Sequence, residues 1–105
     1  MIARIWHGWT SPGNANVYEK IFKEETAINI GNKNIPGYKG IELLKRSTNN
    51  EVEFITIMYF ETMDAIKQFA GEDYSKAVVP EKAQKVLLRY DQTSQHYEIT
   101  KERED

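Results

Sequence analysis

The stretch that decides the fold is residues 51–61, with the sequence Glu51-Val52-Glu53-Phe54-Ile55-Thr56-Ile57-Met58-Tyr59-Phe60-Glu61. Its β-branched and aromatic residues predict a strand. A strand with one face in water alternates apolar and polar residues, but here only Thr56 and the Tyr59 hydroxyl interrupt the apolar run. Both faces of this strand are therefore expected to be covered. A chain of 105 residues has few helices for that purpose, so the simplest cover for the second face is another copy of the chain.

Length and composition are those of one globular domain. The chain is 40% hydrophobic and 29% charged, with a net charge of −2 at pH 7. This balance gives no electrostatic attraction to phosphate backbones or anionic lipid, so we expect neither nucleic acid nor a membrane as a partner. Cysteine is absent, which excludes disulfides and thiolate metal sites. No secretory signal and no apolar run of membrane length is found, and a cytoplasmic location is therefore expected.

Periodicity and turn residues predict the other elements. A first strand is predicted over 2–9 and a helix from the N-cap Asn14 to about Gly31. A second strand is predicted over 38–46, a second helix after Thr62 that Gly71 interrupts, and a final strand over 92–99. Pro80 is predicted to begin a further helical piece that bears Ala83, Val86, Leu87 and Tyr90. Residues 74–79 match no single pattern.

This order, β-α-β-β-α-β, is typical of an α+β, ferredoxin-like fold with an antiparallel sheet. Its helices lie on one face of the sheet and leave the other face bare. We expect the bare faces of two chains to pack together as a homodimer, which closes a dimeric α/β barrel. Residues 1–99 are predicted to form this single domain, and residues 100–105 a polar C-terminal tail.

Four segments carry a resemblance to a known family: residues 2–10, the turn at 35–40, residues 60–65 and the closing residues 95–99. Together they resemble the antibiotic biosynthesis monooxygenase-like group of the dimeric α/β-barrel superfamily. The resemblance implies either a cofactor-independent monooxygenase acting on a small phenol- or quinol-type aromatic substrate, or a non-catalytic homodimer that binds a small ligand or is structural. Haem-degrading members have an Asn on the first strand and a Trp and a His in the second helical region. This chain has Trp6, Phe69 and about Val78 at those positions, so the resemblance does not extend to haem cleavage.

His7 and His96 are the only histidines, and they fall on the first and last predicted strands. Histidine titrates near neutral pH, so both are candidate catalytic residues for proton transfer. The alternative is that both are hydrogen-bonded structural residues at the sheet or the dimer interface. Two histidines without a ligand-like spacing predict no metal site, and no phosphate loop or dinucleotide fingerprint predicts a cofactor.

Five further residues are candidates for binding the substrate. Trp6 and Phe69 are predicted to line the pocket, although aromatic residues in such positions are more often part of the core. Arg4 lies in a strand that is covered on both faces, so it binds either substrate or a structural partner such as Asp91, Glu98 or backbone carbonyls. Asp73 and Tyr74 follow the break at Gly71 and are predicted either to form a pocket rim or to belong to a simple bend. The pocket that these residues form is predicted to lie between the sheet and the helices.

Overall fold

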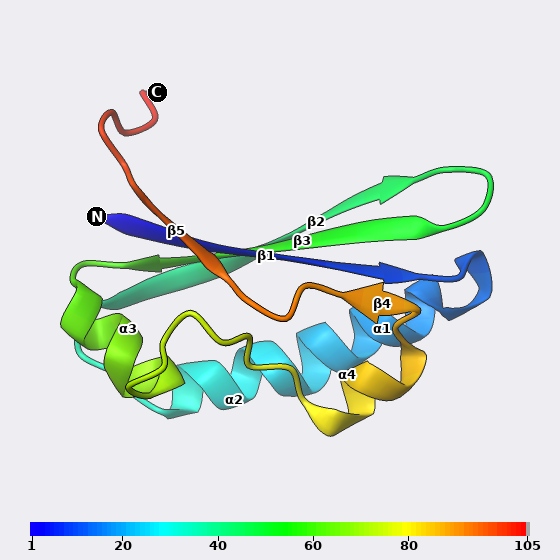
Figure 1. Cartoon of the computed structure of the whole chain (residues 1–105), viewed down its shortest axis with the longest axis horizontal. Helices are drawn as coiled ribbons and strands as arrows, with labels where there is room; N and C mark the ends of the chain where they lie inside the picture. The colour runs from blue at the N-terminus through cyan, green and yellow to red at the C-terminus, as the bar shows by residue number, and fades with distance from the viewer. Residues whose placement is uncertain (105) are drawn as a thin grey trace.

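The structure, a computed structural model, describes residues 1–104 and contains one antiparallel sheet with all its helices on one face (Figure 1). The strands are β1 (Ile2–Thr10), β2 (Tyr38–Ser47), β3 (Val52–Phe60), β4 (Arg89–Tyr90) and β5 (Gln95–Glu98). The helices are α1 (Ala15–Ile21), α2 (Ala27–Asn32), α3 (Met63–Ala70) and α4 (Glu81–Val86). A 3₁₀ turn (Pro12–Asn14) precedes α1, and a π-helical turn (Phe22–Thr26) joins α1 to α2.

The strand order is β2-β3-β1-β4, with β5 also paired to β1. This order confirms the predicted ferredoxin-like topology. Two short segments share one edge of β1. The segment β4 pairs with Gly8 and Trp9 of β1, and β5 pairs with residues 2–5 of β1. The prediction that Tyr90 is helical is wrong. The chain becomes extended at Leu87, and Tyr90 pairs with Gly8 instead.

The first helical region was predicted as one helix, and α1, the π-helical turn and α2 do form one continuous helical segment. The π-helical turn inserts extra backbone in its middle. It brings Phe22, which is buried, and Thr26 to the side that faces the sheet. At the other helix, the predicted cap is confirmed, because the Thr62 side chain accepts a hydrogen bond from Ala65 N. Gly71 ends α3 with a φ of 92°, a conformation that favours glycine.

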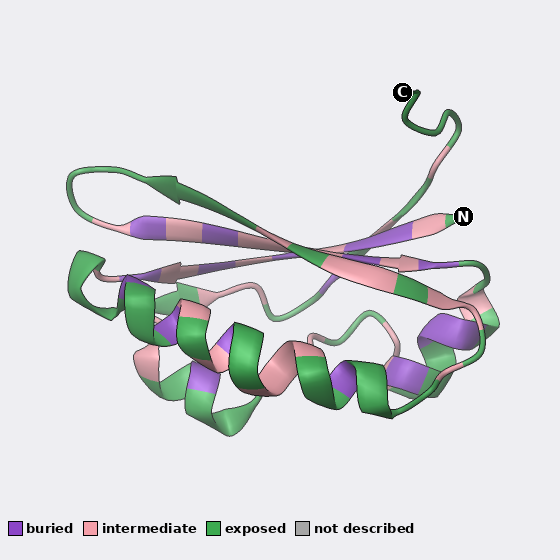
Figure 2. Cartoon of the chain, turned by 180° about the vertical axis from the view of Figure 1, so that it is seen from behind, coloured by how far each residue is buried: buried purple, intermediate pink, exposed green. Residues whose placement is uncertain are grey.

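The core lies between the helices and one face of the sheet. Figure 2 shows that the buried residues on β1 and β3 alternate with partly exposed ones. On β3, Phe54 and Phe60 are fully buried on the helix side. They belong to two neighbouring clusters, one around Trp6, Tyr18 and Phe54 and the other around Met58, Phe60 and Phe69. The pocket described below lies where these clusters meet.

The opposite face of the sheet carries no helix (Figure 1). Its centre carries Ile5 opposite Ile57 in the β1–β3 pairing, and Ile55 beside them opposite His7. These side chains are only partly buried. The third strand is therefore apolar on both faces, and one chain covers only one of them.

Candidate functional site

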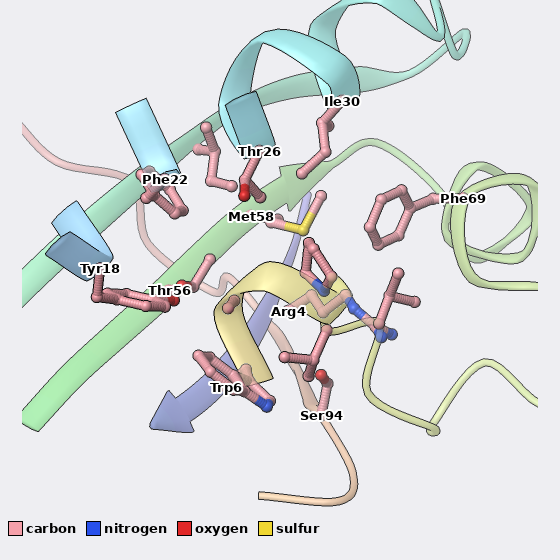
Figure 3. A pocket seen from close by; sticks show the side chains of 15 residues that line it. Arg4, Trp6, Tyr18, Phe22, Thr26, Ile30, Thr56, Met58, Phe69 and Ser94 are labelled. Carbon is pink, nitrogen blue, oxygen red and sulfur yellow. The ribbon is translucent and has the colours of Figure 1, made fainter. Parts of the chain in front are cut away.

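A cavity of about 50 Å³ lies between the sheet and the helices. Figure 3 shows the side chains that converge on it from β1, β3, the first helical segment, α3 and the residues around α4. Its polar or amphipathic lining residues are Arg4, Trp6, Tyr18, Thr26, Thr56 and Ser94. Its apolar lining residues are Phe22, Ile30, Ile41, Met58, Phe69, Val78, Val79, Pro80 and Ala83. The sequence thus places an apolar chamber with few polar groups beneath the sheet, an arrangement typical of small-molecule sites.

An outer groove of about 300 Å³ adjoins this cavity. Five residues line both hollows, and the boundary that they form is called the neck below: Thr26, Ile30, Phe69, Val78 and Pro80. The rim of the groove is charged and carries Glu25, Lys33, Glu81 and Lys82. Lys82 Nζ lies 3.1 Å from Glu25 Oε1, so an ion pair joins α4 to the π-helical turn at the entrance. The groove thus opens to solvent directly beside the inner cavity.

Arg4 is the buried charge of the site, with only 3% of its surface exposed. Its Nη1 donates to the Tyr74 carbonyl and its Nη2 to the Lys76 carbonyl at 3.0 Å. A third bond joins Nη1 to His96 Nε2 at 3.0 Å. Burial lowers the pKa of Arg4 to about 10, so the guanidinium stays charged at neutral pH. Within residues 1–104 it has no carboxylate partner.

Of the partners predicted for Arg4, the backbone carbonyls are confirmed and the carboxylates are wrong. Glu98 pairs opposite Ile2 and is exposed. Asp91 contributes its backbone carbonyl to Trp6 instead. The loop after α3 brings its own carbonyls to Arg4 because residues 74–76 run beside the segment that precedes β5, where Lys76 bridges to Thr93.

The two histidines lie on opposite faces of the sheet. His96 is opposite Arg4 in the β1–β5 pairing and shares its face. Burial, followed by the charge of Arg4, lowers the pKa of His96 below its usual value of 6.5. His7 lies on the bare face, where its Nδ1 is 2.9 Å from Glu53 Oε2 and its ring stacks on Trp9. Neither histidine lines the inner cavity, although His96 contacts it through Arg4.

Trp6 forms one wall of the cavity and is 8% exposed. Its Nε1 donates to the Asp91 carbonyl at 2.9 Å, which fixes the ring. Gly8, two residues along the same face, leaves space for it: a Cβ on Gly8 would lie 2.5 Å from Trp6 Cη2. This close approach explains the glycine in the middle of a β-strand.

The remaining candidates divide between the cavity and its surroundings. Phe69 lines both the cavity and the neck. Tyr74 lies behind Arg4, bonds it through its carbonyl and places its ring 5.5 Å from that of His96. Asp73 is exposed and accepts a hydrogen bond from Ser75 Oγ, away from the lining residues. The structure therefore brings together Arg4, Trp6 and Phe69, with His96 and Tyr74 directly behind Arg4.

Tyr18 and Thr56 were not predicted as site residues, yet both line the cavity. Burial raises the pKa of Tyr18 to about 12, and a hydrogen bond with Thr56 opposes the rise. Tyr18 is therefore neutral at physiological pH and offers an O–H group. Thr56, the polar interruption in the apolar run of β3, was the sequence signal for this pair.

Residues 1–104 contain no cluster of three or more His, Asp or Glu side chains arranged to bind a metal ion. Over the same range, none of the helices has the length and apolar character required to cross a membrane.

Solved structures with a similar fold include the following three. The haem degrader MhuD from Mycobacterium tuberculosis, with two haems bound in its active site, is 19% identical with a TM-score of 0.66, covering 99% of this chain and 100% of that one. A protein from Bacillus cereus provisionally named an antibiotic biosynthesis monooxygenase is 13% identical with a TM-score of 0.67, covering 99% and 97%. A variant of MhuD with two manganese protoporphyrins IX bound per active site is 18% identical with a TM-score of 0.65, covering both chains in full.

No family model matches the sequence, and no curated protein matches it. At these identities the structural similarity shows the fold alone. It extends over the full length of the sheet and helices that enclose the cavity.

Proposed function

From the premise that this chain has the fold of the antibiotic biosynthesis monooxygenase-like proteins, we propose that it is a cofactor-independent monooxygenase for a small phenol- or quinol-type aromatic substrate. The observation that carries the proposal is the cavity beneath the sheet, with an aromatic and apolar lining and a groove that reaches solvent. The substrate ring occupies the groove and neck, with one edge directed toward the cavity.

The chemistry needs little from the protein because an ionised phenol or quinol itself supplies electrons to dioxygen. For an anthrone-type substrate, a CH₂ group and one O₂ become a carbonyl and one water. One oxygen atom bonds to carbon, the other leaves as water, and the two C–H hydrogens enter that water. The protein's part is to exclude water, orient the ring and favour the ionised form of the substrate.

Phe69 supplies a flat apolar wall for the ring at the neck, and Trp6 supplies one for the group that enters the cavity. We assign the proton-transfer role to His96, because it lies on the same face of the sheet as the cavity and is hydrogen-bonded to Arg4. His7 is held by Glu53 on the other side of the sheet. We therefore assign it to the interface between chains.

A porphyrin, which the similar structures of MhuD contain, does not fit this site. Neither histidine of the chain lines the cavity. Haem therefore has no part in the proposed reaction.

We also propose that the protein is a homodimer whose bare sheet faces pack together. Ile5, Ile55 and Ile57 form the centre of this face, and each is only partly buried in one chain. A contiguous apolar patch of this kind marks an interface. The partner would supply the second cover that the apolar β3 requires.

A non-catalytic homodimer that binds a small ligand is the alternative, and turnover separates the two. We would follow oxidation of an anthrone in air by quinone absorbance with wild type, Trp6→Ala, His96→Ala and His7→Ala. Wild type is expected to exceed the rate without protein. Loss of a proton-transfer group costs about 100-fold or more, so a slowing of that size in His96→Ala would assign proton transfer to His96, whereas a few-fold effect would leave it the role of positioning Arg4. His7→Ala should slow the reaction by a few-fold at most.

Catalysis by wild type that survives Trp6→Ala unchanged would place the chemistry outside this cavity. Wild type that does not accelerate oxidation of any anthrone, quinol or phenol tested would support the non-catalytic alternative.

A further inference from the structure

We infer that this pocket selects aromatic ligands that carry an oxyanion, a carboxylate or a phenolate, and that it binds the anionic group against Arg4. The inference rests on the proposed function for the location of the pocket, and it adds the charge of the ligand. It does not depend on turnover.

The first argument is the unbalanced charge of Arg4. The guanidinium is 3% exposed and lines the cavity, yet its hydrogen bonds go to two carbonyls and a neutral imidazole. These acceptors satisfy N–H groups without supplying a negative charge. A buried charge is costly unless it is paired. A ligand with an oxyanion would supply the counter-charge that residues 1–104 do not.

The second argument is that hydrogen-bond donors for an oxyanion remain at this site after Arg4 has made its bonds to the protein. Nη1 and Nη2 take part in the bonds to the protein, and Nε makes none within residues 1–104. Ser94, which is 5% exposed, adds a hydroxyl to the same cavity. An oxyanion can therefore receive charge-assisted hydrogen bonds, which are about twice as strong as neutral ones.

The third argument is the division of space. The inner cavity of about 50 Å³ suits a carboxylate or a phenolate oxygen, but not a ring. The outer groove of about 300 Å³ suits the ring, and Phe69 lies at the neck between the two. A ligand with its anionic group at one end of an aromatic body matches this order of spaces.

The entrance does not produce this selectivity. Its two lysines, Lys33 and Lys82, are balanced by Glu25 and Glu81, and Lys82 is already paired with Glu25. Discrimination between an acid and a neutral analogue therefore depends on Arg4. This dependence is what the experiment measures.

Binding of 2-naphthoate and its neutral analogue 2-naphthamide to wild-type protein would be measured by isothermal calorimetry. We expect the acid to bind about 10- to 100-fold more tightly, the effect of one or two charge-assisted hydrogen bonds. A third ligand, 4-nitrophenol, would be measured below and above its own pKa. Tighter binding of the ionised form would extend the inference to phenolates, and preference for naphthoate alone would restrict it to carboxylates.

Arg4→Met is expected to abolish the preference for naphthoate, and Arg4→Lys to retain part of it. Arg46→Met is the matched control, because Arg46 is an exposed arginine on β2, outside the lining residues, and its loss changes the net charge equally. Equal affinity of wild type for acid and amide would overturn the inference, as would an acid preference that persists in a folded Arg4→Met. The wild-type comparison stands even if Arg4→Met does not fold.

The two proposals fail separately. Naphthoate has no oxidisable position of the quinol type, so acid-selective binding without quinol oxidation would leave the inference intact and remove the monooxygenase. Quinol oxidation by a protein that binds acid and amide equally would do the reverse.

Discussion

Arg4 Nη1 and His96 Nε2 lie 3.0 Å apart, at directly opposed positions of the β1–β5 pairing. A guanidinium only donates hydrogen bonds, so Nε2 must accept and the imidazole must be neutral with its proton on Nδ1. This pair joins the one buried charge of the cavity to one of the two histidines of the chain. Protonation of His96 would place two cations side by side.

The first prediction concerns stability at acidic pH. Burial and the charge of Arg4 lower the folded-state pKa of His96 below its unfolded value of 6.5. The unfolded chain therefore binds a proton more readily, and the free energy of unfolding falls as the pH drops below about 6.5 until the folded-state pKa is reached. Urea unfolding at a series of pH values measures this change in the free energy of unfolding.

His96→Gln retains an oxygen that can accept from Arg4 but does not titrate. The difference in stability between wild type and His96→Gln should therefore change across this range and be constant above it. His7→Gln is the control for the second histidine. A wild-type minus His96→Gln difference that is flat from pH 7 down to acid would contradict the pairing.

The second prediction tests the wall of the cavity. A Cβ on Gly8 would lie 2.5 Å from Trp6 Cη2 and 3.2 Å from Leu87 Cδ2. Gly8→Ala should therefore displace Trp6 and destabilise the protein by about 1–3 kcal/mol, the usual cost of overpacking. Gly13→Ala is the matched control, because a Cβ on Gly13 meets no atom within 4 Å. Chemical denaturation gives the stability, and tryptophan fluorescence reports the movement of the ring.

A Gly8→Ala variant as stable as Gly13→Ala, with unchanged emission, would show that the Trp6 ring is not held against Gly8.

The sequence predicted the sheet and its topology because periodicity and turn residues are local signals. The apolar run of β3, the cap at Thr62 and the break at Gly71 each depend on a few neighbouring residues. The short β4 was not predicted, because the local signals at its residues are those of a helix. Leu87 and Tyr90 continue a helical spacing, and only the pairing of Tyr90 with Gly8, far away in the sequence, makes that segment extended.

The site was less predictable because its contacts are non-local. Alternation along a strand puts Arg4 and Trp6 on one face of β1, but no pattern in the sequence shows that the carbonyls of Tyr74 and Lys76 reach Arg4. No pattern in the sequence predicted the π-helical turn either, although it brings Thr26 to the neck. The roles of the histidines stay predictions.

The third prediction concerns cofactors. The chain has no cysteine and only two histidines, which lie on opposite faces of the sheet. Protein purified from cells is therefore expected to be colourless and free of bound metal. An absorbance spectrum and elemental analysis measure both. Flavin, haem or iron present at one equivalent per chain would contradict the proposed cofactor-independent chemistry.

The fourth prediction concerns the homodimer. Sedimentation at micromolar concentration should give one species at about twice the 12.2 kDa chain mass. Ile57, opposite Ile5 at the centre of the bare face, is the position to change. Ile57→Asp would bury a carboxylate without a partner, and a two-fold interface repeats the penalty on both sides. The variant should therefore sediment as a monomer.

Ile28→Asp is the matched control, because Ile28 is 53% exposed on α2, on the helical side of the molecule. The same loss of an isoleucine and gain of a charge there should leave the dimer intact. A wild type that is monomeric at this concentration would exclude the homodimer. A dimer unaffected by Ile57→Asp would instead place the interface elsewhere, and β3 would then be apolar on a face that water reaches.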